Sequence, residues 1–216
     1  MKKTALLAGA TGLVGKHLLK QLLENPAYDQ IIVVSRRPID NKHPKLKVHI
    51  YNFDQLEDLT LAPGIDECFC TLGTTQKKSG KNGLKKVDFD YVVKLASLCK
   101  KNNIDKFLIV SSQGANQKSM FFYMRTKGQM EQAVKTSGIK TVYIVRPSLI
   151  SGKRDEFRLT ESIGATIYSL FDWMMVGPLK KIKAVSAEKI ANCMIHMAKN
   201  PQTGNFIIES DQIQKY

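Results

Sequence analysis

The sequence lacks any hydrophobic run long enough to cross a membrane, since none of its apolar stretches reaches the ~20 residues that a spanning helix needs. Met1, Lys2 and Lys3 precede an apolar stretch, as they would in a signal peptide. That stretch is short, however, and a glycine-rich turn lies where the cleavage site would have to fall. We therefore expect a soluble, cytoplasmic protein without a membrane span.

Cysteine is scarce, and its spacing does not indicate a metal site or a disulfide framework. The four cysteines are Cys68, Cys70, Cys99 and Cys193, and no C-x-x-C pair occurs among them. The histidines are isolated from one another and lack the spacing of metal ligands. We expect no bound metal, and reduced thiols in the core of a protein from a reducing compartment.

Acidic residues are few: 19 Asp and Glu stand against 33 Lys and Arg, which gives a formal net charge of +14. Such an excess can serve a polyanionic partner. The lysines are spread along the chain, however, and no aromatic residues interleave with them as a platform for single strands would require. We therefore expect a generally basic surface that attracts an anionic cofactor, and nucleic-acid binding is the weaker interpretation.

A glycine-rich turn near the N-terminus is the most informative feature that is present. It joins an apolar strand over residues 4–8 to a helical pattern of apolar residues that begins at Val14. Gly9 permits the tight turn, Gly12 lets the backbone approach phosphates, and Gly15 lets the helix pack closely on the strand. The free N–H groups and positive dipole end of the helix then face the anion. The pattern predicts a dinucleotide site whose binding residues are Gly9, Thr11, Gly12, Leu13, Val14 and Gly15.

Apolar strands alternate with helical patterns along the rest of the chain. The further strands are expected at residues 31–34, 48–51, 67–72, 106–111, 141–145 and 205–209, and the helices at 87–101, 123–136, 159–175 and from Ser186. Strands with few charges, separated by helices, are typical of a parallel sheet covered on both faces. We predict a doubly wound α/β protein with a Rossmann fold, one domain over residues 1–216. Within it, about 150–185 would form a small substrate or lid region, and the polar segment 74–86 a loop near the cofactor.

Tyr123 and Lys127 form a Y-x-x-x-K motif on a predicted helix, so the phenol and the ammonium share one face. A neighbouring ammonium favours the phenolate form of a tyrosine. The tyrosine can then exchange a proton with a substrate oxygen while hydride moves to or from a nicotinamide. The preceding predicted strand ends in Ser111 and Ser112, which places a hydroxyl at the carboxyl edge of the sheet, where ligands of such folds bind.

The glycine turn, the serine after the fifth strand and the Tyr123/Lys127 motif together resemble the short-chain dehydrogenase/reductase superfamily. Three stretches, Gly9-Ala10-Thr11-Gly12, 70–75 and 111–115, narrow the resemblance to one branch of this superfamily. They resemble the atypical branch that includes the Tat-interacting-protein-like NAD(P)H-binding oxidoreductases, and the resemblance covers essentially the whole chain.

The resemblance implies roles for individual residues. Tyr123 would be the catalytic acid/base, Lys127 would bind the nicotinamide ribose and assist Tyr123, and Ser112 would orient the substrate carbonyl, with Ser111 as the competing choice. Leu72 and Gly73 would pass beside the cofactor, and Pro147, Ser148 and Leu149 would flank the nicotinamide. The superfamily often also uses an asparagine on the helix before the fifth strand. The sequence identifies no counterpart, since Asn102 and Asn103 lie at the far end of that helix.

The end of the second predicted strand bears on the choice of nicotinamide cofactor. An NAD-preferring site usually has an acid there for the ribose 2′-hydroxyl, and the acid would repel a 2′-phosphate. This chain has Ser35, Arg36 and Arg37 instead, and guanidinium groups match phosphate geometry. We therefore expect NADP(H) in preference to NAD(H). Asp54, after the third strand, is a candidate adenine contact or, equally, a loop-capping aspartate.

These observations favour an NADP(H)-dependent oxidoreductase that acts on the carbonyl/alcohol pair of a small substrate. One alternative is a non-catalytic NADPH-binding redox sensor that regulates a partner, and another is an NAD(P)-dependent epimerase or dehydratase. Trp173, Met174 and Met175 are most simply core residues. They could instead line a substrate pocket or form a contact in a homodimer or with a protein partner.

Overall fold

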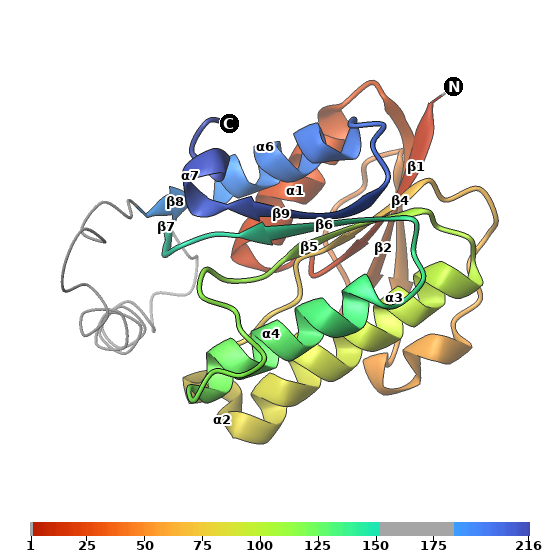
Figure 1. The fold of residues 1–216 in the computed structure, drawn as a ribbon. Coiled ribbons are helices and arrows are strands. Elements are labelled where there is room, and N and C mark those ends of the chain that lie inside the picture. Colours follow the sequence, from red (N-terminus) through yellow and green to blue (C-terminus); the bar gives the residue numbers. More distant parts are fainter. Residues whose placement is uncertain (1, 152–183) are drawn as a thin grey trace.

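The computed structural model describes residues 2–151 and 184–216, and its centre is a seven-stranded parallel sheet (Figure 1). In spatial order its strands are β3 (Leu46–Ile50), β2 (Tyr28–Ser35), β1 (Lys3–Ala8), β4 (Glu67–Cys70), β5 (Lys106–Val110), β6 (Thr141–Arg146) and β9 (Gly204–Glu209). This order reverses between β1 and β4, as in a doubly wound dinucleotide-binding fold. The predicted fold class is therefore confirmed.

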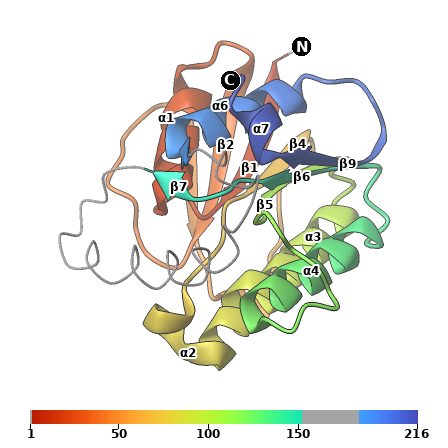
Figure 2. The same ribbon diagram turned by 60° about the vertical axis from the view of Figure 1, so that its left-hand side comes forward.

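Helices cover both faces of the sheet. Figures 1 and 2 show α1 (Leu13–Glu24), α6 (Ala187–Ala198) and the short α7 (Ser210–Ile213) on one face. The other face carries α3 (Tyr91–Lys101) and α4 (Phe122–Lys135), which run side by side, together with the 3-10 segment η1 (Phe53–Asp58). Alternate strand residues supply the two cores: Leu7 packs on the α1 side and Leu6 on the α3 side. This two-sided burial explains why the inner strands read as continuous apolar runs.

The edge strands differ in composition from the inner strands. β3 contains Lys47 and His49, and none of its residues is fully buried. β9 is likewise only half-buried, and Asn205 is exposed on it. Polar and charged side chains on an edge strand discourage pairing with another chain. The composition of each strand therefore follows from its place in the sheet.

The segment 74–86, predicted as a loop, is largely helical. It forms α2 (Gln76–Lys85), which runs into a π-helical turn, η2 (Lys86–Asp90), before α3. The Thr75 hydroxyl caps α2 by accepting a hydrogen bond from the backbone N–H of Lys78. Leu84 is the buried residue of this helix and anchors it to the protein. Gly80, at φ +68°, interrupts the helical dihedrals. The loop prediction was wrong because one cap and one apolar anchor suffice for a helix whose other side is solvated.

The predicted start of the helix at Ser186 is confirmed. Ser186 caps α6, and its hydroxyl accepts from the N–H of Lys189 at 3.2 Å. Two short strands that the sequence did not indicate, β7 (Ile150–Ser151) and β8 (Val185–Ser186), pair in parallel. The helix expected at 159–175 and most of the region 150–185, including Trp173, Met174 and Met175, lie outside the described residues.

Two global expectations can be compared with the structure. All four cysteines are buried and none forms a disulfide, which agrees with reduced thiols in the core. Within residues 2–151 and 184–216, no helix has the length and apolarity to cross a membrane.

Candidate cofactor and active site

The glycine turn after β1 is packed so tightly that two of its glycines are required by the fold itself. Gly9 has φ +93°, and a Cβ there would lie 2.6 Å from the backbone of Thr71. A Cβ on Gly15 would lie 2.0 Å from the carbonyl oxygen of Gly9. Gly12, by contrast, is exposed, and its nearest contact would be 3.3 Å. Gly9 and Gly15 therefore shape the turn, whereas Gly12 presents an open backbone surface.

The start of α1 fits an anionic ligand. Gly12 is the N-cap residue and, as a glycine, offers no side chain to cap the first turn of the helix. Uncapped N–H groups at a helix N-terminus form a site for phosphate, and the helix dipole adds to the attraction. The turn between β1 and α1 thus offers backbone N–H groups to an anionic ligand.

The loop after β4 lies directly against this turn. The backbone N–H and the hydroxyl of Thr71 both donate to the carbonyl oxygen of Ala8, at 2.9 and 3.2 Å. This contact joins the carboxyl ends of the two strands at the point where the strand order reverses, the place where ligands of open α/β sheets bind. Leu72 and Gly73 follow immediately, so the structure brings them beside the glycine turn.

The residues predicted for cofactor selectivity follow β2, the other neighbour of β1. Val34 pairs with Ala8, so Ser35, Arg36 and Arg37 continue along the same edge of the sheet as Gly9. The Ser35 hydroxyl accepts from the N–H of Arg37 at 3.3 Å. Both arginines are exposed, and neither forms an ion pair with any residue that the structure describes. Their guanidinium groups are therefore available to an anion at this edge.

Lys127 is buried inside the molecule, and its ammonium is paired. It forms an ion pair with Asp88 at 2.8 Å, with side-chain exposures of 4% for the lysine and 1% for the aspartate. Burial by itself would lower the pKa of Lys127. The carboxylate of Asp88, with smaller contributions from Tyr123 and Cys70, instead raises that pKa above the ordinary value of 10.5. Lys127 is thus held in its charged form at ordinary pH, beside Tyr123, which is half-buried in the first turn of α4.

The two candidate serines after β5 have different surroundings. The Ser111 hydroxyl donates to Oε1 of Glu131 at 2.6 Å, in a buried contact. Glu131 is in turn held by Arg146, whose Nε and Nη2 donate to its two oxygens at 2.9 and 2.6 Å. Within residues 2–151 and 184–216, the Ser112 hydroxyl makes one hydrogen bond, a 3.3 Å donation to the carbonyl oxygen of Gln113. The hydroxyl of Ser111 therefore belongs to a structural network, and that of Ser112 is weakly held.

The residues after β6 reach the same edge of the sheet. The carbonyl oxygen of Pro147 accepts from the N–H of Gln113 at 2.9 Å, and the hydroxyls of Ser148 and Ser210 lie 2.9 Å apart. Leu149 leads into β7 and accepts from the N–H of Val185. The side-chain oxygen of Gln113 is buried without a hydrogen-bond partner in the described part of the chain. Buried polar atoms usually have a hydrogen-bond partner, and a donor group of a bound ligand at this edge could pair with this oxygen.

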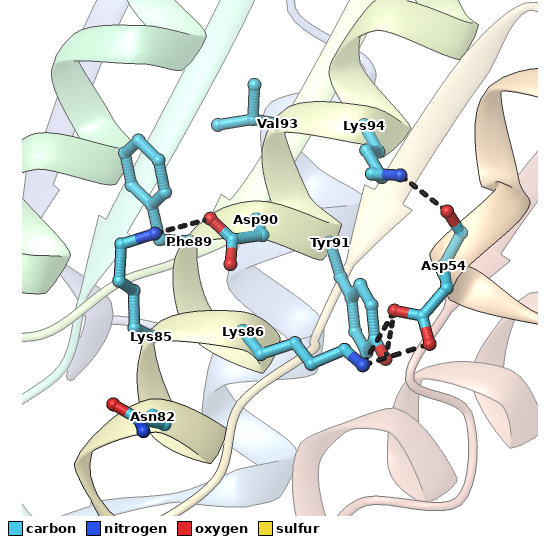
Figure 3. A pocket seen from close by; sticks show the side chains of 9 residues that line it. All are labelled: Asp54, Asn82, Lys85, Lys86, Phe89, Asp90, Tyr91, Val93 and Lys94. Atoms are coloured by element: carbon cyan, nitrogen blue, oxygen red, sulfur yellow. Dashed lines mark hydrogen bonds and ion pairs between the residues drawn. The ribbon is translucent and has the colours of Figure 1, made fainter.

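Asp54 lies apart from these residues, in a pocket of about 600 Å³ between η1, α2, η2 and α3 (Figure 3). Its carboxylate pairs with Lys86 and accepts from the Tyr91 hydroxyl, while its carbonyl oxygen accepts from Lys94. Hydrogen bonding from Lys86 is the main cause of a lowered pKa for Asp54. The loop cap is made by Asn52, whose side chain accepts from the N–H of Asp54. An adenine contact through this carboxylate would compete with existing partners.

Asp88 is the functional candidate that sequence reasoning missed. It occupies the inward position of η2, three residues before Tyr91 and seven before Leu95, both of which are buried. A carboxylate on an otherwise apolar helical stripe was the available signal, because a buried acid needs a partner. The spacing of residues in the sequence does not show that this partner is Lys127 on α4.

A family model described as NAD(P)H-binding matches residues 9–201. The chain belongs to this family. Its relatives include protein FMP52, mitochondrial, of Debaryomyces hansenii, 30% identical over 93% of this chain and 89% of the relative. Protein HTATIP2 of Rattus norvegicus is 30% identical over 94% and 84%. These likenesses confirm the resemblance to the Tat-interacting-protein-like branch of the atypical short-chain dehydrogenases/reductases.

Solved structures confirm the fold. MoeE5 in complex with UDP-glucuronic acid and NAD has a TM-score of 0.72 at 14% identity, with coverage of 96% of this chain and 76% of that one. A UDP-N-acetylglucosamine 4-epimerase from Methanobrevibacter ruminantium has a TM-score of 0.70 at 18% identity, with coverage of 97% and 76%. At these identities the likeness establishes the Rossmann-like architecture.

One expectation is contradicted by the comparisons. Relatives from Debaryomyces hansenii, Aspergillus fumigatus and Aspergillus clavatus are named as mitochondrial proteins. The prediction of a cytoplasmic protein was wrong on this finding. It rested on the absence of a membrane span and of a signal peptide, and neither absence distinguishes the cytosol from an organelle.

Proposed function

We propose that this protein is an NADP(H)-dependent oxidoreductase that acts on the carbonyl/alcohol pair of a small substrate. Membership of the NAD(P)H-binding family supports nucleotide binding. The open backbone at Gly12 and the uncapped start of α1 support a pyrophosphate site, and Arg36 and Arg37 at the end of β2 favour a 2′-phosphate. A bound nicotinamide would supply or accept the hydride.

The chemistry is assigned to Ser112, Tyr123 and Lys127. Tyr123 would exchange a proton with the substrate oxygen, and the charge of Lys127 would stabilise the phenolate form of that tyrosine. Ser112 would orient the substrate carbonyl, since the hydroxyl of Ser111 is already donated to Glu131. Leu72, Gly73, Pro147, Ser148 and Leu149 would border the cofactor at the edge of the sheet.

The observation that carries this proposal is the charged Lys127 buried beside Tyr123. An ammonium with 4% exposure is costly to desolvate, and a structural role could be filled by an apolar residue at lower cost. A short-chain dehydrogenase/reductase uses a permanent cation at this position. The cost is therefore consistent with a requirement for charge.

Calorimetric titration with NADPH and NADH tests the cofactor assignment. We expect NADPH to bind at least about tenfold more tightly, a difference of about 1.4 kcal/mol. The double variant Arg36→Ala/Arg37→Ala should lose this preference, while Lys100→Ala/Lys101→Ala, which removes two exposed cations at the end of α3, should keep it. If neither nucleotide binds, the proposed function fails.

A carbonyl-reduction screen with Tyr123→Phe tests the chemistry. Removing the hydroxyl should lower turnover by about 10²–10⁴-fold, the usual contribution of a positioned acid or base. Tyr51→Phe, at a half-buried tyrosine after β3, serves as the matched control. A redox sensor would instead retain NADPH-dependent partner binding in Tyr123→Phe, and an epimerase or dehydratase would keep its nucleotide bound through purification.

A further inference from the structure

Asp88 connects Lys127 to the loop that follows β4. One carboxylate oxygen, Oδ1, pairs with the Lys127 ammonium at 2.8 Å, and the other, Oδ2, accepts from the backbone N–H of Thr74 at 2.8 Å. A Cβ on Gly73 would lie 3.4 Å from Oδ1. The carboxylate is thus enclosed between α4 and the loop on which Leu72 and Gly73 are expected to meet the cofactor.

The backbone that carries Asp88 is unusual. Residues Lys86–Asp90 form a π-helical turn, closed by a hydrogen bond from the N–H of Tyr91 to the carbonyl oxygen of Lys86. Turns of this kind are rare and often mark functional positions, because one added residue redirects a side chain. Here the turn directs Asp88 inward, whereas the neighbouring Lys86 and Asp90 pair outward with Asp54 and Lys85 (Figure 3).

In the described part of the chain, three titratable groups act on the charge of Lys127, each from a different turn or strand. Asp88 approaches from η2, Tyr123 from the preceding turn of α4, and Cys70 from the end of β4. Burial raises the pKa of the Cys70 thiol to about 12, so this group is neutral at ordinary pH. Asp88 is therefore the carboxylate that compensates the buried ammonium.

We propose that Asp88 is a positioning residue for Lys127: its carboxylate fixes the ammonium beside Tyr123 and links it to the cofactor loop through Thr74. This inference rests on the proposed function for its catalytic meaning. The carboxylate of Asp88 sets the charge state of the lysine as well as its place.

Replacing Asp88 by asparagine has a defined consequence. The variant keeps the side-chain shape and an oxygen for the Thr74 N–H, but removes the negative charge. Burial is then opposed only by the smaller contributions of Tyr123 and Cys70, so the pKa of Lys127 falls. A neutral lysine no longer places a positive charge beside Tyr123, so the loss reaches the proposed chemistry through Lys127.

NMR of lysine-labelled protein without nucleotide tests the proposal directly. The Lys127 side-chain signals, assigned with Lys127→Met, should show a charged amine from about pH 6 to 10 in the wild type. In Asp88→Asn the titration midpoint should fall by at least about one pH unit. Glu131→Gln, which removes a buried carboxylate one turn further along α4, is the matched control and should leave the midpoint unchanged. An unchanged midpoint in Asp88→Asn would overturn the proposal.

A second measurement keeps the proposal testable if Asp88→Asn does not fold. In the wild type, a scalar coupling across the hydrogen bond should join the Lys127 amine nitrogen to the Asp88 carboxylate carbon. Absence of that coupling, in a protein whose Lys127 amine signal is observed, or rapid solvent exchange of that amine, would contradict the inference.

Nucleotide binding separates this inference from the proposed function. NADPH affinity of Asp88→Asn should decline as Lys127 loses its charge, while the wild-type affinity stays level over the same pH range. If the wild type does not bind NADPH, the proposed function fails, and the NMR titration still decides the role of Asp88.

Discussion

Two buried ion pairs lie one turn apart on α4, and they are built differently. Among the residues that the structure describes, Lys127 has one carboxylate partner, Asp88, at 2.8 Å. Glu131 receives two hydrogen bonds from Arg146 and a third from Ser111, and Arg146 extends the network to Glu209 on β9. The first pair has one charge-compensating contact, whereas the second is held redundantly.

This difference in bonding distinguishes a structural ion pair, Arg146 with Glu131, from the ion pair of the proposed active site, Lys127 with Asp88. A bidentate, multiply bonded guanidinium fixes the relative positions of α4, β6 and β9, and the loss of one contact leaves others in place. The buried ammonium of Lys127 has one carboxylate within the described part of the chain, so its charge depends mainly on Asp88. The pair that carries the least redundancy is also the pair beside Tyr123.

Breaking the redundant network should give the largest loss of stability. Arg146→Met leaves the carboxylate of Glu131 buried without its cation, and we expect the free energy of unfolding to fall by about 3–5 kcal/mol. Urea denaturation measures the change. Lys140→Met, which breaks an exposed pair with Asp105, should cost less than about 1 kcal/mol and serves as the control. A loss of similar size in both variants would remove the distinction between these pairs.

The single-partner pair should show a dependence of stability on pH. In the wild type the folded-state pKa of Lys127 is raised, so its stabilising contribution is complete below about pH 10.5 and is lost as the pH rises through the folded-state pKa. In Asp88→Asn that pKa is depressed, so the unfolded chain binds more protons. The free energy of unfolding should then rise by up to about 1.4 kcal/mol per pH unit until about pH 10.5.

The control for this prediction is the double variant Asp88→Asn/Lys127→Met. It has no buried ammonium, so the added slope should disappear from its urea-denaturation profile between neutral and alkaline pH. A profile of Asp88→Asn that runs parallel to the wild type would show that Lys127 keeps its charge without Asp88, and the contrast with Glu131 would then have no basis.

Substitution of the two serines after β5 should give the smallest changes in stability, and it should separate an effect on stability from an effect on turnover. Ser111→Ala removes a donor to the buried Glu131, and we expect a loss of about 1–3 kcal/mol in the free energy of unfolding. Ser112→Ala should change stability by less than about 0.5 kcal/mol but lower turnover in the carbonyl-reduction screen. Thermal unfolding and turnover of both variants would show whether stability and activity separate; the reverse pattern would assign Ser111 to the substrate.

Local sequence determined the fold and the class of ligand. The apolar strands, the helical periodicity and the spacing of Gly9, Gly12 and Gly15 are set by contacts within a few residues, and they were sufficient to predict a parallel doubly wound sheet with a nucleotide turn. The spacing of Tyr123 and Lys127 likewise placed both side chains on one helical face, because four residues make about one turn. The prediction for 74–86 failed because it weighed polar composition above a single cap and a single buried leucine.

Only the tertiary structure decided how the site is held. Asp88 meets Lys127, and Ser111 meets Glu131, because the sheet brings η2, β5 and α4 together across long stretches of chain. Periodicity shows that a residue faces inward but does not show which residue it meets there. The charge of a buried lysine depends on which residue it contacts, since desolvation and ion pairing act in opposite directions on its pKa. The sequence by itself therefore specified which residues are present at the edge of the sheet, and the packing of distant elements determined their charge states and partners.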